Sequence, residues 1–305
     1  MVGSFPALNQ RENSGFDQWL TDIKHALAKN NVQENNTQAN NSNNSAPYAV
    51  NLVVHKTNKR LEEDLETIVK HRVPIVITSL GINQDVINKV QGYGGLVFHD
   101  VIQTRHALKA SQAGVDGLIL VCAGAGGHGG TLNPFAFVGE VRKFYTGTVI
   151  LAGCISRGDD IASARAMGAD LAYMGTRFIA TQEANAVTDY KQMVVDSHTA
   201  DIMYTANISG ISANFLRPSI LASGIDPDNL VKPDKIDLGE ELTAKEDAKD
   251  DSKNNTEDKA GEKKDGAWTS IWSAGQGVGS IDNIVTVAEL VASLTAEYNE
   301  AKGRV

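Results

Sequence analysis

The chain has 305 residues, of which 42% are hydrophobic, 21% charged and 6% aromatic, and its formal net charge is −9. No apolar run reaches the ~18 residues of a membrane span, and no basic-then-apolar leader opens the sequence. The acidic balance also argues against a nucleic-acid surface. We therefore expect a cytoplasmic protein without nucleic-acid or membrane partners.

Apolar runs rich in Val and Ile alternate with amphipathic helical stretches through most of the chain. This alternation predicts parallel strands that are buried on both faces. The predicted strands are Val2–Pro6, Tyr48–Val54, Ile75–Leu80, Leu96–Val101, Gly117–Cys122, Thr148–Gly153 and Leu171–Ile179. The predicted helices are Phe16–Lys29, Asn58–His71, Gln84–Tyr93, Thr104–Ala113, Pro134–Phe144 and Asp159–Met167.

Two low-complexity inserts interrupt this rhythm, at about residues 30–46 and 239–266. The first is rich in Asn, and the second is highly charged. The segment Asp237–Asp265 holds 11 acids and 6 lysines, so more than half of the net charge of −9 lies there. With almost nothing to bury, both inserts are predicted to be disordered surface spacers.

The seven predicted strands are one fewer than the eight of a closed parallel barrel. Two alternatives follow: an open sheet, or a barrel that lacks its first βα unit. In the second case Val2–Pro6 and Leu171–Ile179 would both have unpaired edges. We then expect about 30 residues upstream of Met1 to supply the missing unit.

Polar residues follow several of the predicted strands, where parallel α/β folds place their active sites. Glycines and a hydroxyl end the last two strands, in "AGCIS" and "YMGTRF". Their backbone N–H groups could bind a phosphate, although the glycines could equally serve only tight turns. The candidate phosphate-binding residues are Gly153, Cys154, Gly175 and Thr176.

The stretch "CAGAGGHGG" places His128 in a glycine-rich loop directly after a buried strand. The glycines allow a ligand close approach, and the imidazole could act as a general base or donate a hydrogen bond. A surface or structural histidine is the alternative. His55 and His99 fit a role in the site about as well as a structural role, in which the imidazole at the strand end is hydrogen-bonded within the protein. No ligand spacing predicts a metal site, and Cys122 and Cys154 are expected to be reduced thiols.

Five motifs, taken in chain order, resemble the nitronate monooxygenase family, formerly called 2-nitropropane dioxygenase. They are "VNLVVHKTN", "PIVITSLG", "AGAGGHGG", "GTRFIATQEANA" and "WSAGQGVGSID". The resemblance spans nearly the whole chain apart from the two inserts. It implies a single domain over residues 1–305 with a TIM-type (β/α)8 barrel fold of class α/β that lacks its first βα unit. It also implies FMN as cofactor, and oxidation of alkyl nitronates by O2 to a carbonyl compound and nitrite.

The resemblance also assigns roles to residues. His128 carries over as the catalytic histidine, which would hydrogen-bond a nitronate or remove a proton from a neutral nitroalkane. His55, His99 and Gln276 are substrate-side candidates. The implied flavin contacts are Asn51, Gly126, Gly127, Gly153, Cys154, Tyr173, Met174, Gly175 and Thr176.

Two departures from the family pattern stand out. Cys154 replaces the second glycine of the family's Gly-Gly-Ile phosphate loop, and the strand bearing the family's Ala-Pro-Met flavin contact is absent. Two alternatives to a nitronate monooxygenase therefore stay open. One is a flavin-dependent enoyl-ACP reductase that uses NAD(P)H, and the other is a barrel that no longer catalyses. No motif indicates an oligomeric state.

Overall fold

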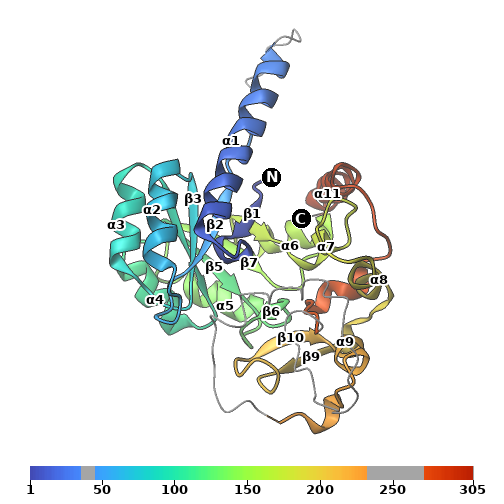
Figure 1. Cartoon of the computed structure of the whole chain (residues 1–305). Coiled ribbons are helices and arrows are strands. Elements are labelled where there is room, and N and C mark those ends of the chain that lie inside the picture. The colour runs from blue at the N-terminus through green and yellow to red at the C-terminus, as the bar shows by residue number, and fades with distance from the viewer. Residues whose placement is uncertain (36–44, 232–270, 305) are drawn as a thin grey trace, which may run out of the picture.

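The protein is described by a computed structural model that covers residues 1–35, 45–231 and 271–304. Within these residues, seven parallel strands form one curled sheet in the order β1-β2-β3-β4-β5-β7-β8 (Figure 1). The predicted α/β class with barrel-type βα order is confirmed. The strands are β1 (Ser4–Pro6), β2 (Ala49–Val53), β3 (Ile75–Ser79), β4 (Leu96–Val101), β5 (Gly117–Val121), β7 (Thr148–Ala152) and β8 (Leu171–Tyr173).

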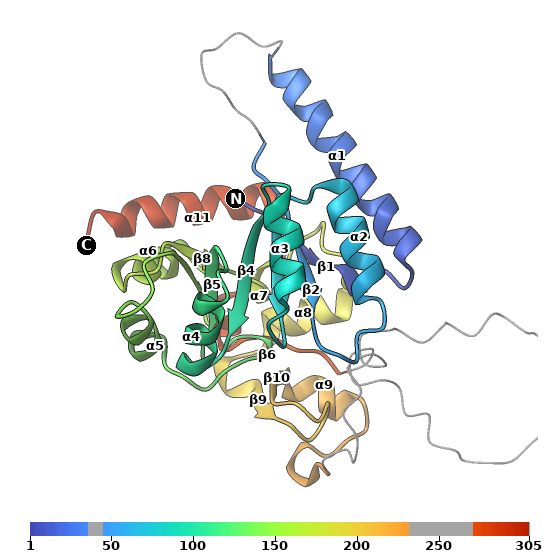
Figure 2. The same ribbon diagram turned by 90° about the vertical axis from the view of Figure 1, so that its left-hand side faces the viewer.

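Helices connect successive strands and cover the outer face of the sheet (Figure 2). The six predicted helices are all present, with ends shifted by a few residues. They are α1 (Asn13–Asn35), α2 (Leu61–His71), α3 (Gln84–Gly92), α4 (Thr104–Gln112), α5 (Pro134–Val141) and α6 (Gly158–Ala166). Within the described residues, four further helices follow β8: α7 (Thr176–Ile179), α8 (Thr188–Asp196), α9 (Arg217–Ala222) and α11 (Val287–Lys302).

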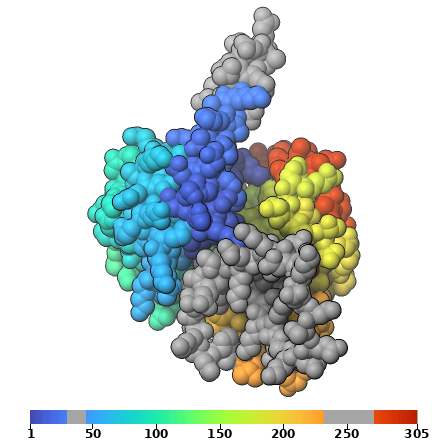
Figure 3. Space-filling model, in the orientation of Figure 1, coloured from blue at the N-terminus to red at the C-terminus, as the bar shows by residue number. Residues whose placement is uncertain are grey.

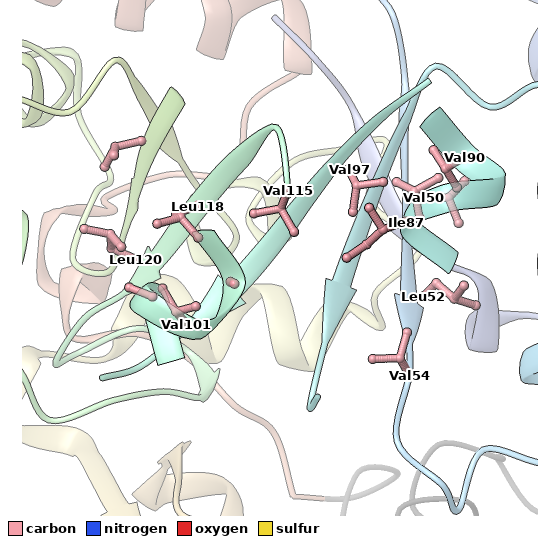
Figure 4. Close-up of a cluster of buried hydrophobic side chains, with 14 of the residues drawn as sticks. Val50, Leu52, Val54, Ile87, Val90, Val97, Val101, Val115, Leu118 and Leu120 are labelled. Atoms are coloured by element: carbon pink, nitrogen blue, oxygen red, sulfur yellow. The ribbon is translucent and has the colours of Figure 1, made fainter. Parts of the chain in front are cut away.

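Side chains alternate between the two faces of the sheet, because a strand has a period of two residues. The outward set packs beneath the helices, as Val50 and Leu52 of β2 and the following Val54 do (Figure 4). The inward set forms a second, smaller apolar cluster inside the curl, which includes Ile77 and Phe98. The sheet is therefore buried on both faces, as its continuous apolar strands predict.

Strands β1 and β8 are the two edges of the sheet order, as predicted for Val2–Pro6 and Leu171–Ile179. The curl brings these edges close together, since Ser4 Oγ lies 2.7 Å from the hydroxyl oxygen of Tyr173. A side-chain hydrogen bond thus links the two edge strands. The prediction that the last strand extends to Ile179 is wrong: it ends at Tyr173, and the apolar residues that follow continue as helix α7.

A second, antiparallel sheet was not predicted from the sequence. It has the order β6-β10-β9 and lies against the end of the parallel sheet (Figure 1). Its strands are β6 (Gly127–His128), β9 (Ile202–Thr205) and β10 (Ala213–Leu216). The two-residue strand β6 belongs to the glycine-rich loop, so this sheet contacts the candidate site directly.

Helix α1 continues to Asn35, into the first part of the segment 30–46 that is predicted to be disordered. The asparagines of residues 30–35 extend a helix that had already nucleated, and elongation costs less than nucleation. The first turns of α1 are packed on the molecule, with Phe16 and Leu20 buried, and its later turns project from it (Figure 3). Residues 36–44 and the whole charged insert 239–266 lie outside the described residues.

Candidate active site

A cavity of about 320 Å³ opens at the carboxyl ends of the parallel strands. Its inner wall is made by inward-facing residues at the ends of four strands: Asp100, Val121, Ala152 and Tyr173. The loops after these strands add further residues, and so does the C-terminal segment that contains Ser273. The cavity therefore lies where parallel α/β folds bind their ligands.

Seven of the predicted site residues meet in this cavity, and six do not. The residues that line it are Gly126, His128, Gly153, Cys154, Tyr173, Gly175 and Thr176. The residues outside its lining are Asn51, Gly127, Met174, His55, His99 and Gln276.

The glycine-rich loop is held by backbone pairing with the antiparallel sheet. His128 pairs with Ala213 and Gly127 with Asn214, so β10 fixes the main chain on either side of the imidazole. Two side chains add to this support: Asn214 Nδ2 donates to Ala125 O at 2.7 Å, and the Tyr204 hydroxyl donates to Gly129 O at 3.0 Å. A loop that looks flexible in sequence is thus firmly placed.

Gly126 allows two segments far apart in the sequence to approach each other. A Cβ atom at Gly126 would lie 2.8 Å from the backbone nitrogen of Gly275 and 3.0 Å from the carbonyl carbon of Ala274. The Gly275 amide in turn donates to Thr176 Oγ1 at 2.8 Å. The C-terminal segment therefore completes the cavity only because position 126 has no side chain.

Backbone amides at the ends of β7 and β8 are available to a ligand. Within the described residues, the N–H groups of Gly153, Cys154, Gly175 and Thr176 donate no hydrogen bond to another part of the protein. The neighbouring amides at the start of α6 are used internally, since Ser156 and Arg157 donate to Asp160 Oδ2 at 2.9 Å. These four residues line the cavity, and amides without an acceptor in the described part of the chain match the needs of a phosphate group.

Cys154 adopts a left-handed backbone conformation, with φ of 57°, where the family pattern has glycine. Its thiol donates to the Ala123 carbonyl oxygen at 3.5 Å. The departure from Gly-Gly-Ile thus leaves the backbone N–H at this position in place.

The sequence interpretation did not select Asp100, Ser273, Gly275 or Gly277. The signal for Asp100 is its spacing of two residues from the inward-facing Phe98. The other three fall in "WSAGQGVGSID", which contributed only to the resemblance. Tyr190 of α8 supports that segment: its ring stacks on Trp272, with the ring centroids 4.9 Å apart, and its hydroxyl donates to the Ser273 carbonyl oxygen.

His99 faces away from the cavity, because it alternates with Phe98 and Asp100 along β4. It is 4% exposed, and its Nδ1 lies 2.7 Å from Thr78 Oγ1. Burial lowers the pKa of His99 to about 4. His55, the other strand-end histidine, contacts Thr57 Oγ1 at 2.9 Å. Both contacts fit the structural alternative for these histidines.

The buried neutral His99 predicts a pH dependence of stability. Its pKa is lower in the folded state than in the unfolded state, so the unfolded state binds more protons between pH 4 and 6.5 and stability falls as pH drops through this range. Between pH 8 and pH 5, we expect wild type to lose about 1–2 kcal/mol more unfolding free energy than His99→Gln. Urea unfolding of both proteins at the two pH values measures this difference, in which the other titrating groups cancel. Equal losses would show that His99 is not kept neutral.

The described residues include neither a candidate metal site nor a membrane-spanning helix. No set of three or more His, Cys, Asp or Glu side chains is gathered closely enough to hold a metal ion. Among these residues there is also no helix with the length and apolar character needed to cross a bilayer.

Comparison with solved structures supports the fold. A nitroalkane oxidase from Streptomyces ansochromogenes matches all of this chain and 90% of its own length with a TM-score of 0.73 and 20% identity. A FabK mutant from Thermotoga maritima covers 93% of this chain and 82% of its own, with a TM-score of 0.65 and 21% identity. At such identities the likeness concerns the fold alone.

Comparison with curated sequences points to one family. A nitronate monooxygenase of Paraburkholderia phytofirmans is 30% identical over 250 residues, which cover 78% of this chain and 64% of the relative. A putative monooxygenase of Mycobacterium tuberculosis is 25% identical, over 83% of this chain and 66% of the relative. The chain thus spans just under two thirds of the length of these two relatives. The family model described as nitronate monooxygenase matches residues 18–297, and the chain therefore belongs to the nitronate monooxygenase family.

Proposed function

We propose that this protein is an FMN-dependent monooxygenase that oxidises alkyl nitronates with O2 to a carbonyl compound and nitrite. Its cofactor domain would comprise residues 1–305. The observation that carries the proposal is one cavity that combines available backbone amides at the ends of β7 and β8 with the firmly held His128. Family membership supports the same activity.

The residues of the cavity fit a flavin nucleotide. Its phosphate would be held by the backbone amides of Gly153, Cys154, Gly175 and Thr176. Within the described residues these amides donate no other hydrogen bond. Gly126 would lie beside the flat ring system, where a side chain is already excluded by the C-terminal segment. Asn51, Gly127, Tyr173 and Met174 stay predicted flavin contacts, and among these four Tyr173 lines the cavity.

His128 would bind the substrate anion. Burial lowers the pKa of its imidazole, so the ring is neutral at pH 7 and offers an N–H donor without a charge. A nitronate carries its negative charge on two oxygens, and a preorganised donor in a water-poor site stabilises such an anion strongly. The pairing of β6 with β10 fixes where this donor lies.

The remaining walls limit access of water. Val121, Ala152, Ile155 and Ile179 give the cavity an apolar lining. When bound, FMN supplies the electron-transfer and oxygen chemistry. The protein's own part is to orient the nitronate, to stabilise its charge through His128 and to exclude water.

Oxygen consumption tests the proposal. The purified protein is assayed with propyl-2-nitronate, with and without added FMN, and its flavin spectrum and flavin content per chain are recorded. We expect nitronate-dependent oxygen uptake together with nitrite release. Anaerobic reduction of the flavin by NADH, without nitronate oxidation, would instead favour the enoyl-ACP reductase alternative. Protein without flavin and without oxygen uptake would favour a barrel that no longer catalyses.

A further inference from the structure

Asp100 is a carboxyl group in the wall of the cavity for which the proposed function has no use. It lies near the end of β4, two residues after the inward-facing Phe98, and it lines the same cavity as His128. It is partly buried. Within the described residues, its carboxyl group forms no hydrogen bond and no ion pair. A carboxyl group in such a place without a structural partner is a candidate for chemistry.

The surroundings of Asp100 contain no compensating charge. Among the described residues that line the cavity, none is Lys, Arg or Glu, and the other titratable side chains are His128, Cys154 and Tyr173. They come from the elements that surround Asp100: strand β6, the loop after β7, and strand β8. In the sheet, Asp100 pairs with Ile119 of β5, and Ser79 follows the Thr78–His99 pair on β3; neither Ile119 nor Ser79 carries a charge. Asp100 is therefore free to change its protonation state without breaking an ion pair.

Asp100 and His128 line the same cavity, and burial changes their basicity in opposite directions. It raises the pKa of Asp100 to about 7 and lowers the pKa of His128. A carboxylate that has lost water becomes a stronger base, whereas a buried imidazole becomes a weaker one. A general base works best when its pKa lies near the working pH.

We propose that Asp100 is a second catalytic residue, which removes the proton when the substrate enters as a neutral nitroalkane. This inference rests on the proposed function and extends its substrate class from nitronates to their neutral acids. The carboxylate of Asp100 takes the proton from the carbon that bears the nitro group. The electron pair of the broken C–H bond forms the C=N bond of the nitronate, and one negative charge passes from Asp100 to the nitro oxygens.

The two cavity residues then have separate duties. Asp100, on the parallel sheet, holds the proton that the substrate gives up. His128, on the antiparallel sheet, donates a hydrogen bond to the nitro oxygens as their charge develops. A substrate that arrives already as a nitronate needs only the second duty, so the two substrates separate the two residues experimentally.

The test compares Asp100→Asn with wild type on nitroethane and on preformed ethyl nitronate, from pH 5.5 to 9. With nitroethane, we expect wild-type kcat/KM to rise with pH through about 7 as Asp100 ionises. We expect Asp100→Asn to lose about 10²–10⁴-fold with nitroethane and to change little with the nitronate. Asp85→Asn, an exposed carboxylate on α3, is the matched control and should behave like wild type.

Further measurements separate a catalytic role from a structural one. Flavin content per chain should be the same in Asp100→Asn and wild type. In protein labelled with ¹³C-aspartate, one carboxyl resonance should titrate near pH 7 and be missing from the variant. Added formate should restore nitroethane oxidation to Asp100→Ala, since the cavity left by the side chain admits a small base.

Four results would overturn the inference. Equal losses of Asp100→Asn on both substrates at full flavin content would assign Asp100 to anion binding, and no loss would remove it from the reaction. Wild type that oxidises ethyl nitronate but never nitroethane would overturn this inference alone and leave the proposed function standing. Wild type that oxidises neither substrate would overturn both.

Discussion

His128→Ala is expected to lower kcat/KM for alkyl nitronates by about 10²–10³-fold, the usual loss when one preorganised donor to a developing anion is removed. The same factor should apply to neutral nitroalkanes, because Asp100 and not His128 takes their proton. Oxygen uptake with both substrates measures the two losses. Flavin content should stay at the wild-type level, because the backbone of position 128 is held by its pairing with Ala213.

His128→Asn serves as the conservative comparison. Its amide also donates a hydrogen bond, so it should recover part of the activity that His128→Ala loses, and the pH profile with nitroethane should keep its midpoint. A loss far greater with nitroalkane than with nitronate would contradict this division of duties and make His128 the base. A loss below about tenfold on both substrates would remove His128 from anion stabilisation.

Gly158→Ala is expected to destabilise the fold by about 3 kcal/mol, the upper part of the usual range for overpacking. Gly158 is the first residue of α6, and its Cβ would lie 2.2 Å from the Leu294 carbonyl oxygen and 2.5 Å from the Tyr298 backbone nitrogen. Both atoms belong to the backbone of α11, so no side chain can rotate out of the way. The two helices must move apart, and the hydrogen bond from the Gly158 amide to Glu297 Oε2, 2.6 Å long, is then weakened.

Gly139→Ala is the matched control, since Gly139 is also a helical glycine and nothing lies within 4 Å of its Cβ position. There the added methyl group should stabilise the protein by up to about 1 kcal/mol, the difference in helix propensity. Urea unfolding of the two variants beside wild type measures both effects. Equal stabilities of the two variants would mean that α6 and α11 can separate at little cost.

The βα order was predictable because it depends on local patterns. Apolar runs such as Gly117–Val121 are strands wherever they occur between helical stretches, and their parallel pairing follows from the alternation. The antiparallel sheet was not predictable in this way. Strand β6 has two residues, and it is a strand only because β10 pairs with it from more than 80 positions along the chain. No local pattern carries such a long-range contact.

The site was predictable to the extent that strand ends and glycines indicate it. His128 and the glycines of the last two βα turns come from motifs, and the cavity brings them together. His99 and Asp100 show the limit of that approach, because they are neighbours in the same strand and only one of them can face inward. Counting in steps of two from Phe98 would have favoured Asp100, but which face is inside depends on how the whole sheet curls.

The main-chain pairing between β6 and β10 has a consequence for how this site can diversify. A strand ladder delivers whatever side chain stands at position 128 to the same place, because the bonds that hold it involve no side-chain atoms. Residue 128 can therefore be exchanged without rebuilding its support, while the backbone amides at the ends of β7 and β8 stay as they are. A library of variants confined to positions 100 and 128 would change the reaction and leave the scaffold intact. These two positions are therefore a small set of targets for redesigning the chemistry of the barrel.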